Sequence, residues 1–151
     1  MPRTIQNAAA DAVLKAADAL TAALLNLPQE KRAWKPAPNA RTARNQVAEC
    51  ALLNGCTADL LTARAWQITD FDAFFRDRDL LADGEEETLQ TRLHANAQRV
   101  ADAIRALSDD DLEIEIEPPW RRQTLAEIIA YPHWNMSYHE GQINYIASLT
   151  S

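Results

Sequence analysis

The sequence comprises 151 residues, of which 47% are apolar and 25% are charged. That length and composition are typical of one globular domain with a sizeable core, and they exclude a disordered chain. Acidic residues outnumber basic residues by 22 to 15, and the net charge of −7 argues against nucleic acid and anionic membranes as partners. Cys50 and Cys56 are too few for a disulfide framework, and no stretch resembles a signal peptide or has the length of a membrane span. We therefore expect a cytoplasmic protein with reduced thiols.

Two long helices are predicted in the first part of the chain. Apolar residues recur at helical spacing from about residue 4 to residue 27, with Thr4 as the expected cap and Pro28 as the stop. After a proline-rich loop, a second helical pattern begins near Thr42 and continues to about Trp66.

The segment that follows is mixed in character. Three phenylalanines between residues 71 and 75 predict a short helical turn packed on the rest of the protein. Asp83, followed three residues later by Glu86, has the pattern of a capping box and predicts the start of a third long helix. The stripe of that helix, over residues 89–107, has the most regular amphipathic spacing in the chain.

A fourth helix is predicted to occupy most of the remaining chain. Apolar and acidic residues alternate over residues 112–116, which favours a short extended piece. Thr124 and Glu127 form a second capping-box pattern, and the helix that it opens runs to about Leu149. Pro132 lies inside this helix and is expected to kink it.

Four amphipathic helices in one short chain predict an all-α fold, a four-helix bundle that forms a single domain over residues 1–151. The connections between the helices are too long to be tight hairpins only. We therefore expect at least one crossover connection.

Bundles place ligand and metal sites in the core, so polar residues on the inward stripes are the candidates. His139 shares the stripe of Met136 and Ile143, and it is either a core histidine with one hydrogen bond or a ligand or general base. Asn135 lies one turn before it, on the same face. Glu49 lies among apolar residues of the second helix, and its helical phase allows either solvent or core.

The remaining candidates rank lower. His133 lies about 120° around a straight helix from His139, although a kink at Pro132 would turn it inward. Cys50 is expected to be a small core residue and not a nucleophile. Gly141 is unusual in mid-helix, where glycine generally permits close helix approach or access to a site.

Two segments resemble signatures of the DinB/YfiT-like superfamily. Residues 138–143 (YHEGQI) are similar to its HxGQ signature. Residues 42–49 (TARNQVAE) are similar to a segment of its second helix that begins with serine and ends with histidine. Residues 34–36 (WKP) resemble the run that precedes that helix. The resemblance implies a DinB-like bundle, frequent homodimers, and a divalent-metal site of three histidines, one on the second helix and two spaced by four on the fourth.

The resemblance places Glu49, Asn135 and His139 at the three ligand positions, so only one histidine is kept. It also implies that Glu49 points inward. Such a set could hold Mg²⁺, Mn²⁺ or Ca²⁺ loosely, or Zn²⁺ or Ni²⁺ with water, or no metal if Glu49 bonds His139 directly. Tyr138 and His133 are expected proton donors beside this site, and Gln142 is a further neighbour.

The resemblance implies a metal-dependent enzyme of the thiol S-transferase or hydrolase type, in which a metal activates a thiol or water. The alternative is a non-catalytic bundle, dimeric or small-molecule-binding, that has lost the metal site. A third hypothesis is a partner-binding bundle that acts through its acidic face or through the loops that carry Trp34, Trp66 and Trp120.

Overall fold

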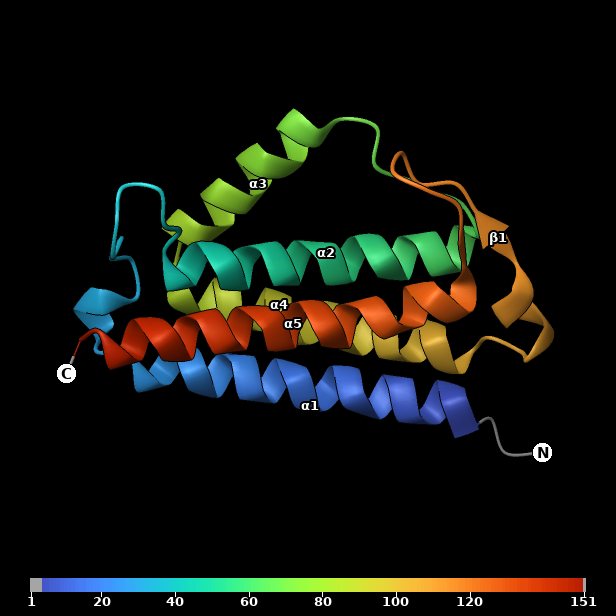
Figure 1. Cartoon of the computed structure of the whole chain (residues 1–151), viewed down its shortest axis with the longest axis horizontal. Helices are drawn as coiled ribbons and strands as arrows, with labels where there is room; N and C mark the ends of the chain where they lie inside the picture. The colour runs from blue at the N-terminus through green and yellow to red at the C-terminus, as the bar shows by residue number, and fades with distance from the viewer. Residues whose placement is uncertain (1–3, 151) are drawn as a thin grey trace.

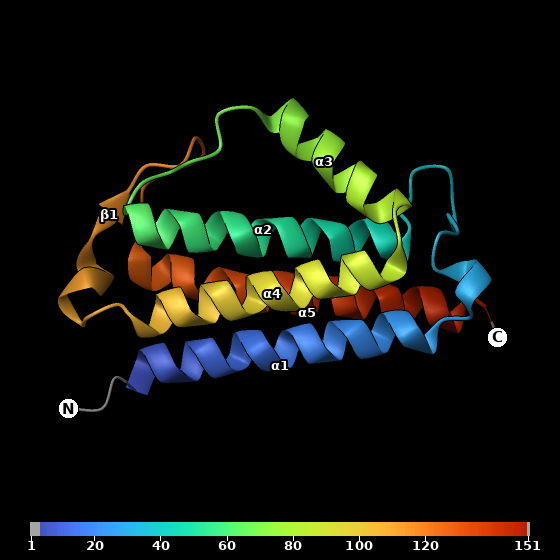
Figure 2. The same ribbon diagram turned by 180° about the vertical axis from the view of Figure 1, so that it is seen from behind.

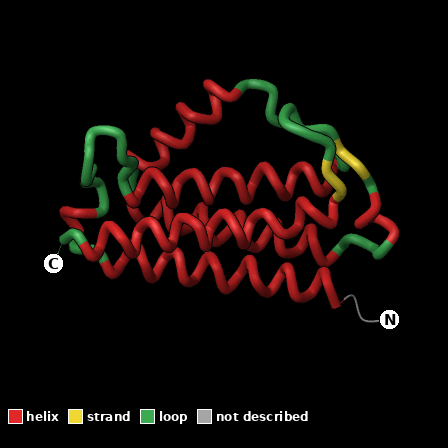
Figure 3. The backbone as a smooth tube through the Cα atoms, viewed as in Figure 1, coloured by secondary structure: helices red, strands yellow, loops and turns green. Residues whose placement is uncertain are grey.

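The computed structural model describes residues 4–150. Within that range the chain is mainly helical, with long connecting loops, one short antiparallel strand pair and two 3-10 turns (Figure 3). The elements are α1 (Thr4–Asn26), η1 (Gln29–Lys31), α2 (Ala43–Ala63), α3 (Phe71–Asp83), α4 (Glu86–Arg105), η2 (Asp110–Glu113), β1 (Glu115–Ile116), β2 (Gln123–Thr124) and α5 (Leu125–Ser148).

Four of the helices form a bundle around one apolar core, which confirms the predicted fold class. Helices α1 and α2 each pack against both α4 and α5, so α1 and α2 lie diagonally opposite each other (Figures 1 and 2). The inward stripes supply large side chains that are fully buried. They include Leu20, Leu24, Leu61, Leu89, Leu93, Ile104, Leu125, Met136 and Ile143.

The predicted crossover connection is present. Helices α2 and α4 run in the same direction, and α3 leads the chain obliquely back along the outside of the bundle between them (Figures 1 and 2). Residues 71–75 are helical as predicted, but they open a helix of 13 residues whose cap is Asp70, so the predicted turn is too short. Only Leu81 and Ala82 of α3 are buried, because this helix lies on the outside of the bundle.

The predicted cap of the third long helix is also wrong. Asp83 is the last residue of α3, and only Gly84 and Glu85 separate it from the start of α4. A residue in helical conformation cannot act as the N-cap of the next helix. Helix α4 begins without a side-chain cap, and its acidic first turn instead complements the helix dipole.

The capping box of α5 is confirmed. Thr124 Oγ1 accepts a hydrogen bond from the Glu127 N–H at 3.3 Å, and Glu127 Oε2 accepts one from the Thr124 N–H at 2.9 Å. We expect Thr124→Ala to lower the free energy of unfolding by about 1 kcal/mol, because it leaves a helix N–H without its partner. Urea denaturation measures this, and Thr91→Ala, at an exposed site inside α4, is the matched control that should cost nothing. Equal losses in both variants would contradict the assignment.

Helix α5 continues through Pro132, which is buried, and a kink at this proline stays a prediction. None of the helices in residues 4–150 combines the length and the apolar character needed to cross a membrane.

Candidate functional site

A cluster of polar side chains joins α2 and α5 around His139, which is only 5% exposed. His139 Nε2 lies 2.9 Å from Glu49 Oε2. On the other side of the ring, Nδ1 lies 2.8 Å from Gln46 Oε1 and 2.9 Å from Gln142 Oε1. Because an ionised carboxylate can only accept hydrogen bonds, the contact with Glu49 requires a proton on Nε2.

Arg41 reaches the same carboxylate from the loop before α2. Its Nη1 donates to Glu49 Oε2 at 2.9 Å, and its Nε donates to Asn45 Oδ1 at 2.8 Å. The Thr42 side chain caps α2 by accepting from the Asn45 N–H, which fixes where the loop meets the helix. One oxygen of Glu49 therefore accepts from both the guanidinium and the imidazole ring.

These partners hold Glu49 in its charged form. Burial alone would raise the pKa of its carboxyl group, but the hydrogen bonds from His139 and Arg41 and their positive charge outweigh it. The pKa of Glu49 falls from 4.5 to about 2 as a result. Glu49 thus points inward and remains ionised across the physiological range.

Asn135 takes no part in this network, although it lies one turn from His139. Its side-chain amide nitrogen faces Cys50 Sγ at 3.6 Å, and the side chain is buried. Burial raises the pKa of the Cys50 thiol far above its ordinary value, so Cys50 does not supply a thiolate. Cys50 is fully buried, in agreement with the prediction of a core residue.

The arrangement does not fit a divalent cation. Arg41 places a positive charge on the carboxylate oxygen that a metal would need, and His139 Nε2 carries a proton where a metal needs a lone pair. Asn135 turns its amide nitrogen toward a thiol. Across residues 4–150, no group of three or more histidine, cysteine, aspartate or glutamate side chains is placed to hold a metal ion.

A groove of about 720 Å³ opens above His139. One wall is the loop over residues 36–41, and the other is the outer face of α5, with Tyr138 and Tyr145. Gly141 also lines it, and a Cβ atom built there would meet no atom within 4 Å. No helix in the described part of the chain packs closely against Gly141, so the close helix approach considered from the sequence is wrong.

The structure brings together only some of the residues singled out from the sequence. Gln142 bonds His139, and the Tyr138 ring lies edge-on to the imidazole with centroids 5.3 Å apart. His133 is exposed and lines a shallow hollow against α1, so the rotation toward His139 considered at Pro132 does not occur. His133 is therefore not a proton donor in this site.

Sequence reasoning missed Arg41 and Gln46. Gln46 lies three residues before Glu49 on α2, so the spacing could have placed both on one face. Arg41 lies in an irregular loop, and no periodic pattern shows where such a side chain points.

Comparison with solved structures finds YfiT from Bacillus subtilis, described as a probable metal-dependent hydrolase with an unusual four-helix bundle topology. The match covers 99% of this chain and 90% of that one, with a TM-score of 0.83 and 13% sequence identity. The chain has the YfiT fold. The fold implied by the resemblance is thereby confirmed. No family model matches the sequence, and no curated protein does so either.

Proposed function

We propose that this chain of the YfiT fold is a metal-independent binding protein for a small organic anion, held in the groove above His139. The observation that carries the proposal is that Glu49 forms an ion pair with Arg41 and a hydrogen bond with His139. Arg41 supplies a fixed positive group at the place where the family resemblance implies a metal.

Arg41 has donors left for a ligand. A guanidinium has five N–H donors, and the contacts of Arg41 with Glu49 and Asn45 use three of them. Its side chain is 36% exposed and lines the groove. A carboxylate in the groove can therefore accept a charge-assisted hydrogen bond from Arg41 without displacing Glu49.

Glu49 and His139 act as the support of this site. The Glu49 carboxylate holds the Arg41 guanidinium at 2.9 Å, and Gln46 and Gln142 fix the opposite side of the His139 ring. The groove above them presents amide and phenol groups, and the lining includes no acidic side chain. The positive charge of Arg41 and the absence of a lining carboxylate both favour an anion.

Metal-dependent hydrolysis is the function that the name of the Bacillus subtilis neighbour suggests. In this chain a metal would have to displace Arg41 from Glu49 and remove the Nε2 proton of His139. In the family that this chain resembles, both hydrolysis and thiol S-transfer use a nucleophile that a metal activates. We therefore prefer a binding function without a metal to either reaction.

Isothermal titration with benzoate, and with benzamide as its uncharged counterpart, tests the proposal. We expect benzoate to bind the native protein and benzamide to bind at least tenfold more weakly, because only benzoate gains a charge-assisted bond (about 1.5–3 kcal/mol). Arg41→Gln should weaken benzoate binding by about tenfold, and the exposed Arg92→Gln should not change it. Equal binding of the two probes, or no effect of Arg41→Gln, would refute an anion site at Arg41.

A further inference from the structure

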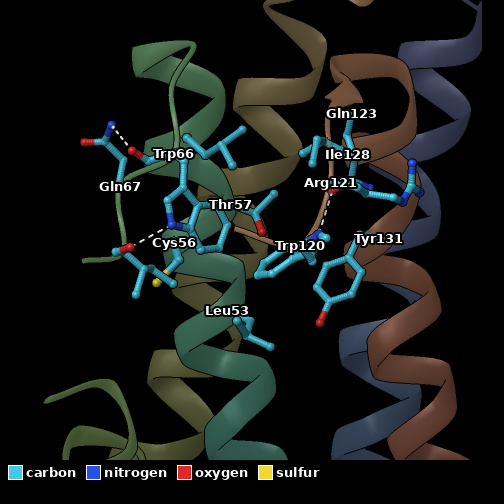
Figure 4. Close-up of a pocket in the computed structure, with 12 residues that line it drawn as sticks. Leu53, Cys56, Thr57, Trp66, Gln67, Trp120, Arg121, Gln123, Ile128 and Tyr131 are labelled. Carbon is cyan, nitrogen blue, oxygen red and sulfur yellow. Dashed lines mark hydrogen bonds between the residues drawn. The ribbon is translucent and has the colours of Figure 1, made fainter. Parts of the chain in front are cut away.

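A second cavity lies between the end of α2 and the start of α5, on the side of the bundle that carries the β1–β2 loop (Figure 4). Its volume is about 350 Å³, within the range of small-molecule sites, and it shares no lining residue with the groove above His139. Leu53, Leu60 and Ile128 give it an aliphatic floor.

Three aromatic side chains form its walls. Trp66 follows α2, Trp120 comes from the β1–β2 loop, and Tyr131 lies on α5 (Figure 4). The two indole rings meet edge to face, with centroids 4.8 Å apart and planes at 83°. Segments far apart in the sequence thus converge to build an aromatic pocket.

The polar edges of both indoles are already bonded within the chain. Trp66 Nε1 donates to the Ile68 carbonyl at 2.6 Å, and Trp120 Nε1 donates to Gln123 Oε1 at 3.1 Å. The indoles therefore offer a ligand the carbon surface of their rings and no free N–H. This favours a flat aromatic ligand over a hydroxyl-rich one.

The remaining lining groups are uncharged or neutralised. Burial raises the pKa of Tyr131 to about 12, so its hydroxyl stays protonated and can donate a hydrogen bond. Burial also raises the pKa of the Cys56 thiol. Arg121 at the rim is paired with Glu127 at 3.1 Å. Within residues 4–150 no other charged side chain lines the cavity, and this favours an uncharged ligand.

We propose that this cavity binds a small, planar, uncharged aromatic molecule, such as a substituted naphthalene or indole, between Trp66, Trp120 and Tyr131. An acceptor atom on the edge of the ligand would accept a hydrogen bond from the Tyr131 hydroxyl. The site is independent of the anion site at Arg41, because the two have no residue in common.

Fluorescence titration of the full chain with 6-propionyl-2-(dimethylamino)naphthalene, an uncharged naphthalene with a carbonyl acceptor, tests this proposal. We expect saturable binding of one probe per chain with a blue-shifted emission. Trp120→Ala should weaken binding by about tenfold, because it removes one aromatic wall. Trp120 is 59% exposed, so its truncation should leave the fold intact, and circular dichroism checks this. Leu53→Trp should abolish binding by filling the cavity.

Two further variants serve as matched controls. Trp134 is a similarly exposed tryptophan on α5 that does not line the cavity, although its ring contacts that of Tyr131 with centroids 5.8 Å apart. Trp134→Ala should therefore weaken probe binding far less than Trp120→Ala does. Arg41→Gln should leave the probe affinity unchanged, which separates this site from the anion site. Absence of saturable binding, equal weakening by Trp120→Ala and Trp134→Ala, or unimpaired binding by folded Leu53→Trp would each overturn the proposal.

Discussion

Acidification from pH 6 to pH 2 should lower the free energy of unfolding of the native protein by about 3 kcal/mol more than it lowers that of a Glu49→Gln variant. The pKa of Glu49 is about 2 in the folded protein and 4.5 in its ordinary state. The unfolded chain therefore binds a proton before the folded chain does. The stabilisation from Glu49 is complete above pH 4.5 and is lost as the pH falls toward 2.

Urea denaturation at a series of pH values measures this difference. The matched control is Asp77→Asn, which removes an exposed carboxylate from the middle of α3 and should follow the native pH profile. Parallel profiles for the native protein and Glu49→Gln would show that Glu49 is not held ionised by Arg41 and His139.

A second large loss of stability is expected when Gly55 is replaced, because α2 packs closely on α4 at this residue. A Cβ atom at Gly55 would lie 2.8 Å from Asn96 Nδ2 and 3.2 Å from its Cγ. Asn96 cannot easily move, because it is buried and its Nδ2 donates to the Ala51 carbonyl at 2.8 Å. Gly55→Ala should therefore lower the free energy of unfolding by about 2 kcal/mol through overpacking, despite the better helix propensity of alanine.

Gly141→Ala is the matched control for that substitution. Gly141 also lies inside a helix, but a Cβ atom there meets nothing within 4 Å. Helix propensity then acts alone, and the variant should gain about 0.5–1 kcal/mol. Thermal or urea denaturation measures the stability of both variants. A loss of stability in Gly141→Ala or a gain in Gly55→Ala would contradict the packing described.

The sequence predicts the bundle because its helices carry strong local signals. The stripes of α1, α2, α4 and α5 have helical spacing, and Thr124 with Glu127 marks the start of α5. Helix α3 lies outside the bundle and buries only Leu81 and Ala82, so core packing does not mark its length in the sequence. The mistaken cap at Asp83 has the same origin, since α3 occupies that residue.

The candidate site is only partly predictable for a related reason. His139 stands out because it shares an apolar stripe, and the family resemblance turns Glu49 toward it. Arg41 decides the chemistry of the cluster, yet it is placed by a loop whose course depends on the finished fold. Local periodicity carries no information about such a contact.

We expect the cluster of Arg41, Glu49 and His139 to operate without a divalent metal. Elemental mass spectrometry of the untagged chain, purified without chelator and dialysed after exposure to Zn²⁺, Ni²⁺ and Mn²⁺, tests it most directly. The positive control is a double variant, Glu49→His with Asn135→His, which restores three imidazoles at the positions that the resemblance implies and should retain close to one ion per chain. We expect far less than one ion per native chain. Close to one ion per native chain, lost in Glu49→Ala and in His139→Ala, would contradict it.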